Sequence, residues 1–173
     1  MRTLKIIEHI SLDGVIQSSG EDGFPYAEWT APYRTPAGRD LLLAEHGERF
    51  DLLLGRRTYD MWSGFWPKAP SSPFADRLNA ATKYVVTHRP ESLEWGPFVG
   101  LGPDVVESVR RIKSEDGPAL ILSGSSTLTS TLLEHGLADE VLLIVYPVLL
   151  GTGKRFYAER TPARALELLG TRA

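Results

Sequence analysis

The sequence contains no cysteine in its 173 residues. This absence excludes disulfide bonds, thiolate metal sites, iron–sulfur clusters and cysteine nucleophiles, and it fits a cytoplasmic protein, because disulfides are rare in that compartment. Basic charge is scarce as well: 19 Lys and Arg stand against 22 Asp and Glu, and the formal net charge is -3. Since binding to nucleic acid needs many phosphate-neutralising cations, we expect no nucleic-acid partner.

Long apolar runs are also missing. The longest, from Val141 to Leu150, contains Pro147 and is about half of the roughly 20 residues that a membrane helix needs. Near the N-terminus, Glu8 and His9 interrupt the apolar residues before a signal-peptide core develops. We therefore expect no membrane partner, and the length predicts a single domain over residues 1–173.

Segments whose apolar residues follow the period of a strand alternate along the chain with segments that follow the period of a helix. This alternation is typical of an α/β protein, in which helices cover a central sheet. The long segment 17–36 is rich in Gly, Ser, Pro and aromatic residues, and loops of this length in compact domains are usually functional. We predict strands at residues 3–10, 51–54, 83–87, 98–101, 119–122, 140–149 and 164–169, and helices at 37–49, 56–64, 72–81, 103–113 and 127–135.

Several familiar motifs fail on inspection. Residues Gly151–Lys154 suggest a phosphate loop, but Val148 replaces its first glycine and Arg155 replaces its magnesium-binding hydroxyl residue. Phe156 replaces the third glycine of the dinucleotide fingerprint. The four histidines lack metal-ligand spacing, so we expect no metal, and residues 123–126 have the wrong order for the nucleophile elbow of a hydrolase.

Two strand-to-helix turns retain ligand-binding chemistry. They are residues 54–58 (Leu-Gly-Arg-Arg-Thr) and 123–127 (Ser-Gly-Ser-Ser-Thr). A helix N-terminus presents unpaired N–H groups and a partial positive charge, which suit a phosphate, and Gly124 lets the backbone approach a ligand closely. Each turn alone also fits an ordinary capped turn. Together they indicate one dinucleotide spanning both, with three arginines available: Arg56, Arg57 and Arg89.

Six segments match a known family in order between residues 3 and 157. They are residues 11–14, 54–59, 83–87, 122–125, 136–140 and 146–156. Through them the chain resembles dihydrofolate reductases, and more closely the C-terminal reductase domain of bifunctional riboflavin-biosynthesis deaminase–reductases and its small stand-alone bacterial relatives. The resemblance implies a three-layer αβα fold with a mixed central sheet, NADPH as cofactor and, through a shared strand before residue 150, a homodimer.

The resemblance also implies roles for particular residues. The first turn would hold cofactor phosphates, the end of the following strand the adenosine 2′-phosphate, and the second turn the pyrophosphate, while a third segment would border the nicotinamide. These cofactor-binding residues are, in that order, Gly55, Arg56, Arg57 and Thr58; Thr87, His88 and Arg89; Ser123, Gly124, Ser125 and Ser126; and Gly14, Val15 and Ile16. Arg57 or Arg89 near the extra phosphate would favour NADPH over NADH, with a solvated loop charge as the alternative for Arg89.

The catalytic carboxylate of dihydrofolate reductases lies on the first helix, where Asp40 is the candidate here. An Asp favoured by the helix dipole is the alternative for that residue, and Asp13 is a second candidate, although Asp before Gly usually forms a turn. Trp29, Trp62 and Trp66 are candidates to wall a substrate pocket, with core packing as the alternative. The family continues through a further strand after a segment like 166–171, whereas this sequence stops at residue 173.

These features predict an enzyme, an NADPH-dependent oxidoreductase acting on a small heterocyclic molecule. Among the family's substrates, the nearest analogue is 5-amino-6-(5-phosphoribosylamino)uracil, followed by dihydrofolate. The alternative is a non-catalytic protein that binds NADPH or a planar heterocycle, stacked on the aromatic residues of segment 24–33. Turnover of the cofactor distinguishes the two.

Overall fold

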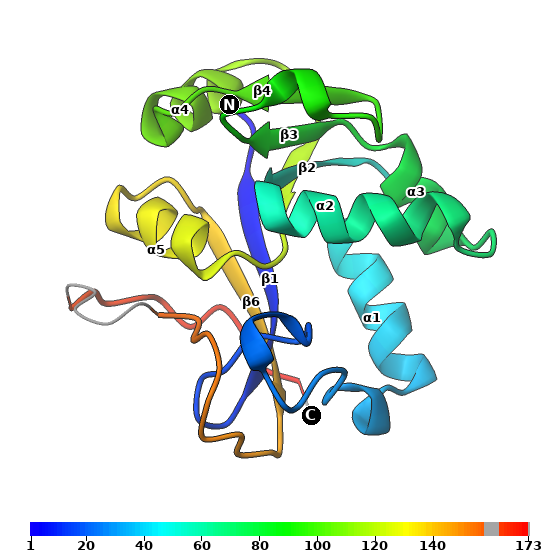
Figure 1. Ribbon diagram of the computed structural model, residues 1–173. Coiled ribbons are helices and arrows are strands. Elements are labelled where there is room, and N and C mark those ends of the chain that lie inside the picture. The colour runs from blue at the N-terminus through cyan, green and yellow to red at the C-terminus, as the bar shows by residue number, and fades with distance from the viewer. Residues whose placement is uncertain (158–162, 173) are drawn as a thin grey trace.

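A computed structural model describes residues 1–157 and 163–172. Six strands form one sheet in the order β4-β3-β2-β5-β1-β6, and every strand pairing in it is parallel (Figure 1). The strands are β1 (Leu4–Ser11), β2 (Phe50–Gly55), β3 (Lys83–Val86), β4 (Phe98–Leu101), β5 (Ala119–Leu122) and β6 (Glu140–Tyr146).

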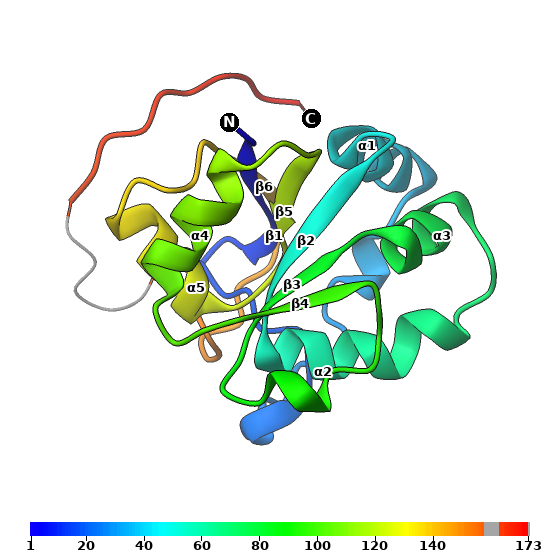
Figure 2. The same cartoon turned by 90° about the horizontal axis from the view of Figure 1, so that it is seen from above.

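Helices cover both faces of the sheet, as Figure 2 shows from above. One face carries α1 (Pro36–His46), α2 (Arg56–Phe65) and α3 (Pro73–Ala80), and the other carries α4 (Val105–Ser114) and α5 (Ser126–Glu134). The predicted three-layer α/β fold is confirmed. Its expected mixed sheet is parallel over the described residues, where the one antiparallel contact outside the strands is an isolated bridge between Val15 and Arg155.

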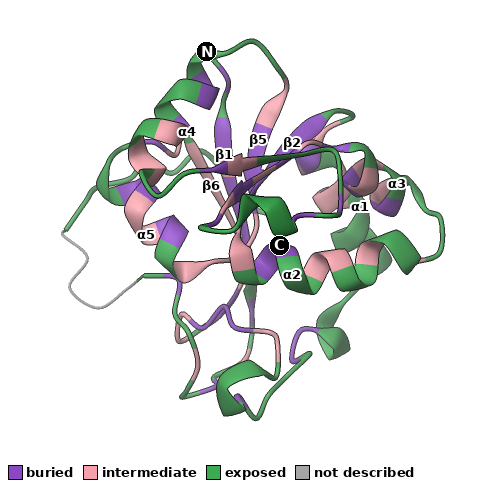
Figure 3. Ribbon diagram, turned by 45° about the horizontal axis from the view of Figure 1, so that its top comes forward, coloured by how far each residue is buried: buried purple, intermediate pink, exposed green. Residues whose placement is uncertain are grey.

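The core lies in two layers, one on each face of the sheet (Figure 3). Successive side chains of a strand point to opposite faces, so Ile6 packs with the α4–α5 layer and Ile7 with the layer formed by the other three helices. Strands buried on both faces read as continuous apolar runs, which explains the run Leu52–Leu54 in β2 and the run Ala119–Leu122 in β5.

Side-chain caps begin four of the five helices. The side chains of Thr35, Ser72, Asp104 and Ser125 each accept a hydrogen bond from a backbone N–H in the first turn that follows. The exception is α2, whose N-cap is Gly55 and which has no side-chain cap. The first N–H groups of α2 are therefore left available.

Four predicted elements need correction. The helix predicted over residues 37–49 ends at His46, because Gly47 follows it with φ +77°. Residues 164–169 are not a strand: the described segment 163–172 pairs with no strand, and Leu166, Leu168 and Leu169 are exposed. The predicted strand 140–149 ends at Tyr146, because Pro147 cannot donate to a ladder. The helix predicted from residue 103 begins at Val105, after its Asp104 cap. Within residues 1–157 and 163–172, no helix has the length and apolarity to cross a membrane.

Candidate functional site

The sheet opens between β1 and β5. These strands pair only over Leu4–Ile6 and Leu120–Leu122, after which β1 continues beside β6 alone. The chain leaves β1 towards β2 on one face of the sheet and leaves β5 towards β6 on the other face. In parallel α/β sheets, this change of direction leaves a crevice at the carboxyl ends of the strands where ligands bind.

A cavity of about 670 Å³ occupies this crevice. Its wall combines both predicted turns with side chains from β1, α1, α2, α3 and the segment after β6. It is lined by Ile7, Glu8, His9, Ile16, Gln17, Ser18, Ser19, Glu21, Leu42, His46, Gly55, Arg56, Arg57, Thr58, Met61, Trp62, Trp66, Phe74, Ser123, Gly124, Ser125, Ser126, Thr127 and Lys154.

The two predicted turns converge on this cavity. A Cβ added to Gly55 would lie 3.0 Å from Oγ of Ser125, and one added to Gly124 would lie 3.4 Å from Oγ1 of Thr58. Gly124 has φ +75°, a conformation that favours glycine. The starts of α2 and α5 thus stand side by side, and their N–H groups and partial positive charges act on the same space.

Cations gather beside these helix starts and form the polar half of the cavity. Asp22 Oδ2 lies 3.0 Å from Nη1 of Arg57 and 2.7 Å from Nζ of Lys154, so one carboxylate joins segment 17–36, α2 and the segment after β6. The two cations lower the pKa of Asp22. All three side chains are largely exposed, so the bridge contributes little to stability and does not prevent the cations from binding a phosphate instead.

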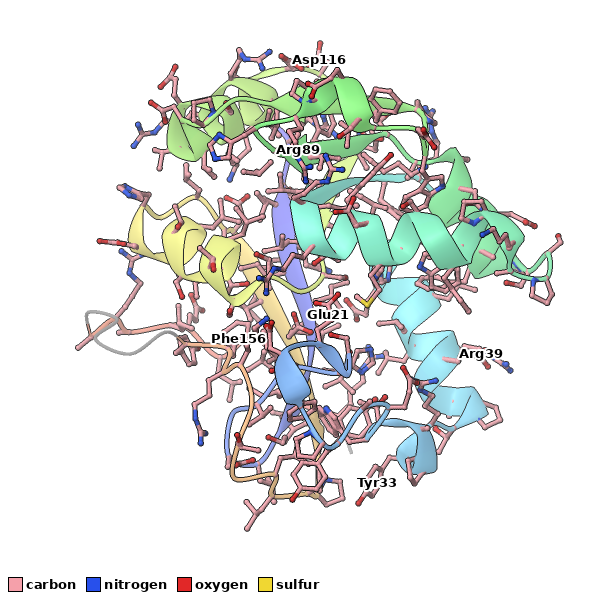
Figure 4. The ribbon with its side chains drawn as sticks, in the orientation of Figure 1. Glu21, Tyr33, Arg39, Arg89, Asp116 and Phe156 are labelled. Atoms are coloured by element: carbon pink, nitrogen blue, oxygen red, sulfur yellow. The ribbon has the colours of Figure 1, made fainter. Side chains whose placement is uncertain are left out.

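A second hollow, of about 250 Å³, lies beyond the start of α2. It is lined by Thr87, His88 and Arg89, together with Arg56. The Nη1 group of Arg56 donates to Oγ1 of Thr87 at 3.3 Å and to the carbonyl of Arg89 at 3.1 Å, which fixes its guanidinium there. In Figure 4, Arg89 and Glu21 lie on either side of the start of α2. Arg57 does not line this hollow, so of the two predicted 2′-phosphate ligands only Arg89 is placed in it.

Glu8 is a carboxyl group buried in the crevice, with 6% of its surface exposed. Its Oε2 accepts the Gly124 N–H at 2.7 Å and its Oε1 accepts the His9 N–H at 3.2 Å. Burial raises the pKa of Glu8 to about 7, although both hydrogen bonds favour the charged form. A carboxyl with this pKa can hold or release a proton at neutral pH.

The other half of the cavity is apolar and aromatic. The Trp62 and Trp66 rings meet edge to face with centroids 6.0 Å apart, and Trp66 meets Phe74 in the same way at 5.6 Å. Two histidines complete this half, which is lined by Ile7, His9, Leu42, His46, Met61, Trp62, Trp66 and Phe74.

Asp40, the predicted catalytic acid, is exposed and does not line the cavity. Helix α1 presents Leu42 and His46, four residues apart, to the cavity. A residue two positions before Leu42 points about 200° away around a helix, since each residue turns about 100°. Asp40 therefore faces solvent, and the structure corrects this prediction. The alternative, Asp13, accepts the Gly151 N–H at 2.7 Å and lies in a turn outside the cavity wall.

The remaining predicted residues are divided between the cavity and its support. Trp62 and Trp66 line the cavity, as does Ile16, whereas Gly14 and Val15 do not. Trp29 is also outside it: its ring packs against Tyr146 at 5.3 Å, and its Nε1 donates to the carbonyl of residue 17 at 2.8 Å. Trp29 therefore holds segment 17–36 against the sheet, and the structure does not place it in a substrate pocket.

Sequence reasoning missed several polar groups of the cavity, among them Glu8, His9, His46 and Lys154. For the first two, the available signal was a pair of polar residues inside an otherwise buried strand, because a buried polar group needs a partner or a purpose. His46 and Lys154 gave no such signal, since a histidine at a helix end and a lysine in a loop are commonplace.

Together, the open parallel sheet, its switch-point cavity and two converging phosphate-type turns define a dihydrofolate reductase-like α/β protein. The model of the RibD C-terminal domain family matches residues 2–173. The chain belongs to this family.

Relatives and solved structures agree with the assignment. Two Bacillus subtilis (strain 168) proteins described as uncharacterized are similar to the chain: YyaP is 26% identical over 70% of this chain and 66% of its own length, and YwjB is 27% identical over 94% and 87%. A candidate riboflavin biosynthesis protein from Shewanella sp. PV-4 superposes with a TM-score of 0.69 at 18% identity, covering 98% of this chain and 91% of that one.

Two further structures have TM-scores of 0.59. One is dihydrofolate reductase from Enterococcus faecalis complexed with NADP(H) and RAB-propyl, at 18% identity over 91% of this chain and 77% of that chain. The other is the Thermotoga maritima diaminohydroxyphosphoribosylaminopyrimidine deaminase/5-amino-6-(5-phosphoribosylamino)uracil reductase, at 17% identity over 95% of this chain and 51% of that chain. The family and these neighbours support a reductase-like function.

Proposed function

We propose that this protein is an NADPH-dependent reductase of a small heterocyclic substrate. One observation carries the proposal: two helix starts converge on a single cavity whose other half is apolar and aromatic. The first half suits a diphosphate, and the second suits flat rings placed beside each other. The resemblance to the riboflavin-pathway reductase and to dihydrofolate reductase supports the same reaction class.

The residues present fit the cofactor. Gly55–Thr58 and Ser123–Ser126 would hold its diphosphate, because the start of α2 has no side-chain cap and both turns line the cavity. Thr87, His88 and Arg89 would hold the 2′-phosphate in the second hollow. Ile16, supported by Gly14 and Val15, would border the nicotinamide. When bound, the cofactor would supply the hydride.

Reduction also requires a proton, and we assign it to Glu8. With a pKa of about 7, its carboxyl is about half protonated at neutral pH. Among the described lining residues the other carboxyl is Glu21, which is exposed. Only 6% of the surface of Glu8 is exposed, so its carboxyl would hold the proton with little competition from solvent until a basic ring atom approaches.

We also propose that the protein is cytoplasmic and forms a homodimer. β6 lies at the edge of the sheet, pairs only with β1 among the described strands, and contains only Val, Leu and Ile between Glu140 and Tyr146. An exposed apolar edge strand readily pairs with another chain. A second copy of β6 would cover it.

Cofactor binding and turnover test the proposed function. We expect NADPH to bind with a saturable fluorescence change and to be oxidised with one member of a panel of pterins, pyrimidines and other heterocycles. Arg89→Ala is expected to weaken NADPH binding by about ten- to a hundredfold and to leave NADH binding unchanged, because one charged hydrogen-bonded contact contributes about 1.5–3 kcal/mol. Arg57→Ala is expected to weaken both cofactors, since Arg57 lines the shared part of the cavity.

The matched control is Arg110→Ala, which removes an exposed arginine of α4 outside both hollows. Failure of both cofactors to bind would refute the reductase assignment. Saturable binding without oxidation for any substrate would instead favour the non-catalytic binder. Equal loss of NADPH and NADH binding in Arg89→Ala would remove the 2′-phosphate role from that residue.

A further inference from the structure

We infer that the apolar half of the cavity binds a flat, uncharged heteroaromatic ring that carries an N–H donor and no phosphate group. The inference rests on the proposed function, in which the cofactor occupies the polar half. It concerns the substrate class, and it separates this protein from a reductase of a phosphoribosylated pyrimidine.

Charge is distributed unevenly over the cavity wall. Its lysine and arginine residues are Arg56, Arg57 and Lys154, and all three belong to the turn at α2 or to the segment after β6. The lining residues of the apolar half include no lysine or arginine. A phosphate placed there would lose its hydration without gaining a charged partner, which is strongly unfavourable.

The nearest cations outside the wall do not face the apolar half. Arg34 is near enough to influence the pKa of His9, but its exposed guanidinium lies outside the cavity, with Nη2 2.9 Å from Oε2 of Glu28. Lys5, which influences His46, lies 3.0 Å from Glu45 and 3.1 Å from Glu140. Neither cation lines the cavity.

The two histidines of the apolar half are neutral. Burial is the main cause that lowers the pKa of His9 to about 4, and the nearby Arg34 and His46 lower it further. Burial likewise lowers the pKa of His46. At neutral pH this half therefore contains no formal charge among its lining residues and offers only hydrogen bonds to a ligand.

The structure fixes the hydrogen-bonding role of His46. Its Nδ1 lies 2.7 Å from the carbonyl of Leu42, which can only accept, so Nδ1 carries the proton and Nε2 is an acceptor. Nε2 is closed to solvent and has no hydrogen-bond partner among the described residues. Leaving a buried acceptor unpaired costs about 1–3 kcal/mol. Because His46 belongs to the cavity wall, a ring that shifts the neighbouring side chains slightly can bring an N–H to Nε2 and recover this loss.

The shape of the wall favours a ring. The Trp62, Trp66 and Phe74 rings are packed edge to face, which presents aromatic faces and edges at right angles to one another. His46 is held in the same way by Phe74, with centroids 5.0 Å apart and an interplanar angle of 85°. A planar heterocycle can stack on such a wall while its edge meets the imidazole.

Isothermal titration calorimetry of the full chain, with and without saturating NADP⁺, tests the inference with matched probes. Lumazine carries ring N–H donors, whereas 1,3-dimethyllumazine has the same ring without them; uridine and uridine 5′-monophosphate differ by the phosphate alone. In the NADP⁺-saturated protein, lumazine should bind at least tenfold more tightly than its dimethyl derivative. Uridine 5′-monophosphate should bind no more tightly than uridine.

The variant His46→Phe keeps the aromatic packing but removes Nε2, and it should reduce the lumazine preference to about twofold or less. The control His135→Phe changes an exposed histidine at the end of α5 and should keep the preference. Equal binding of the two lumazines by the native chain would overturn the inference, as would tenfold tighter binding of uridine 5′-monophosphate, even if His46→Phe does not fold. Lack of NADP⁺ binding would refute the proposed function instead, and the lumazine pair would still test the apolar half in the free protein.

Discussion

Glu8 shows how the environment of a single residue creates chemistry that its identity does not reveal. The same side chain on a surface strand would simply be charged at neutral pH. Here it faces the start of α5, is 6% exposed, and receives two backbone N–H groups in place of water. Two neutral donors do not compensate for the lost hydration, so the pKa of Glu8 is raised to about 7.

This raised pKa makes a prediction about stability and pH. The pKa of Glu8 is higher in the folded state than in the unfolded chain. Ionisation of Glu8 therefore does not lower the free energy of unfolding below about pH 4.5, and it lowers this free energy progressively as the pH rises to about 7. The difference in free energy of unfolding between Glu8→Gln and the native chain should therefore shift in favour of the variant from pH 5 to pH 8, by on the order of 2–3 kcal/mol. Urea unfolding at the two pH values measures this difference.

Glu21→Gln is the matched control for this experiment, since Glu21 is an exposed carboxyl at the same cavity. The depressed pKa of His9 acts in the opposite direction, destabilising the fold as the pH falls below 6.5, but it is present in both proteins and cancels. A Glu8→Gln effect that does not change between pH 5 and pH 8 would show that Glu8 titrates normally.

At this scale the sequence predicts the two turns that line the cavity but not the buried carboxyl beside them. Gly55 and Gly124 could be singled out because their positions follow from local turn chemistry. The burial of Glu8 depends on a helix more than 110 residues away, which no local pattern contains. The position of Asp40 could not be predicted for a related reason: only the packed orientation of α1 decides which of its faces meets the cavity.

At the scale of elements, the turn before α5 combines two constraints in consecutive residues. Gly124 has φ +75° and Ser125 has φ +68°, so the chain makes two left-handed steps before the helix begins. The Ser125 hydroxyl then accepts the Leu128 N–H at 3.3 Å and caps the helix. The cap offsets the strain of a non-glycine residue in this conformation.

Substitutions at Ser125 separate cap from strain. Ser125→Ala keeps the strain and loses the cap, so the free energy of unfolding should fall by about 1 kcal/mol. Ser125→Gly loses the cap but relieves the strain, and it should cost clearly less. Urea denaturation of both variants measures the order, and a glycine variant less stable than the alanine variant would contradict this account.

Most elements could be predicted, because they alternate and each has its own apolar period. All six strands and all five helices lie within a few residues of the predicted positions. The predicted strand at 164–169 fails for a physical reason: its leucines have the right composition, but a strand also needs a neighbouring strand, and composition does not supply one.

At the scale of the whole molecule, the two edges of the sheet differ. β4 is short, with four residues, and η4 (Pro90–Ser92) packs near it. β6 has seven residues, and Val145 near its end is 56% exposed. Since a long apolar edge strand offers a second chain more unpaired backbone groups than a short covered one, we place the proposed dimer contact at β6.

Val145→Lys should convert the dimer to a monomer, because a lysine on an edge strand opposes pairing between chains. Val99→Lys on β4 is the matched control, since Val99 is 39% exposed at the opposite edge, and it should leave the dimer intact. Size-exclusion chromatography with light scattering measures both. A native chain that is monomeric at all concentrations would rule out the dimer, and dissociation by Val99→Lys alone would move the contact to β4.

The cavity wall begins at Ile7 and ends at Lys154, so it is assembled from nearly the whole length of the chain. No contiguous fragment shorter than residues 7–154 contains it, and a partly unfolded molecule that releases β1 or the segment after β6 lacks part of the wall. A ligand that binds only the complete fold stabilises it by mass action. Occupancy of the site should therefore protect remote surface loops from proteases and raise the melting temperature of the chain as one cooperative unit.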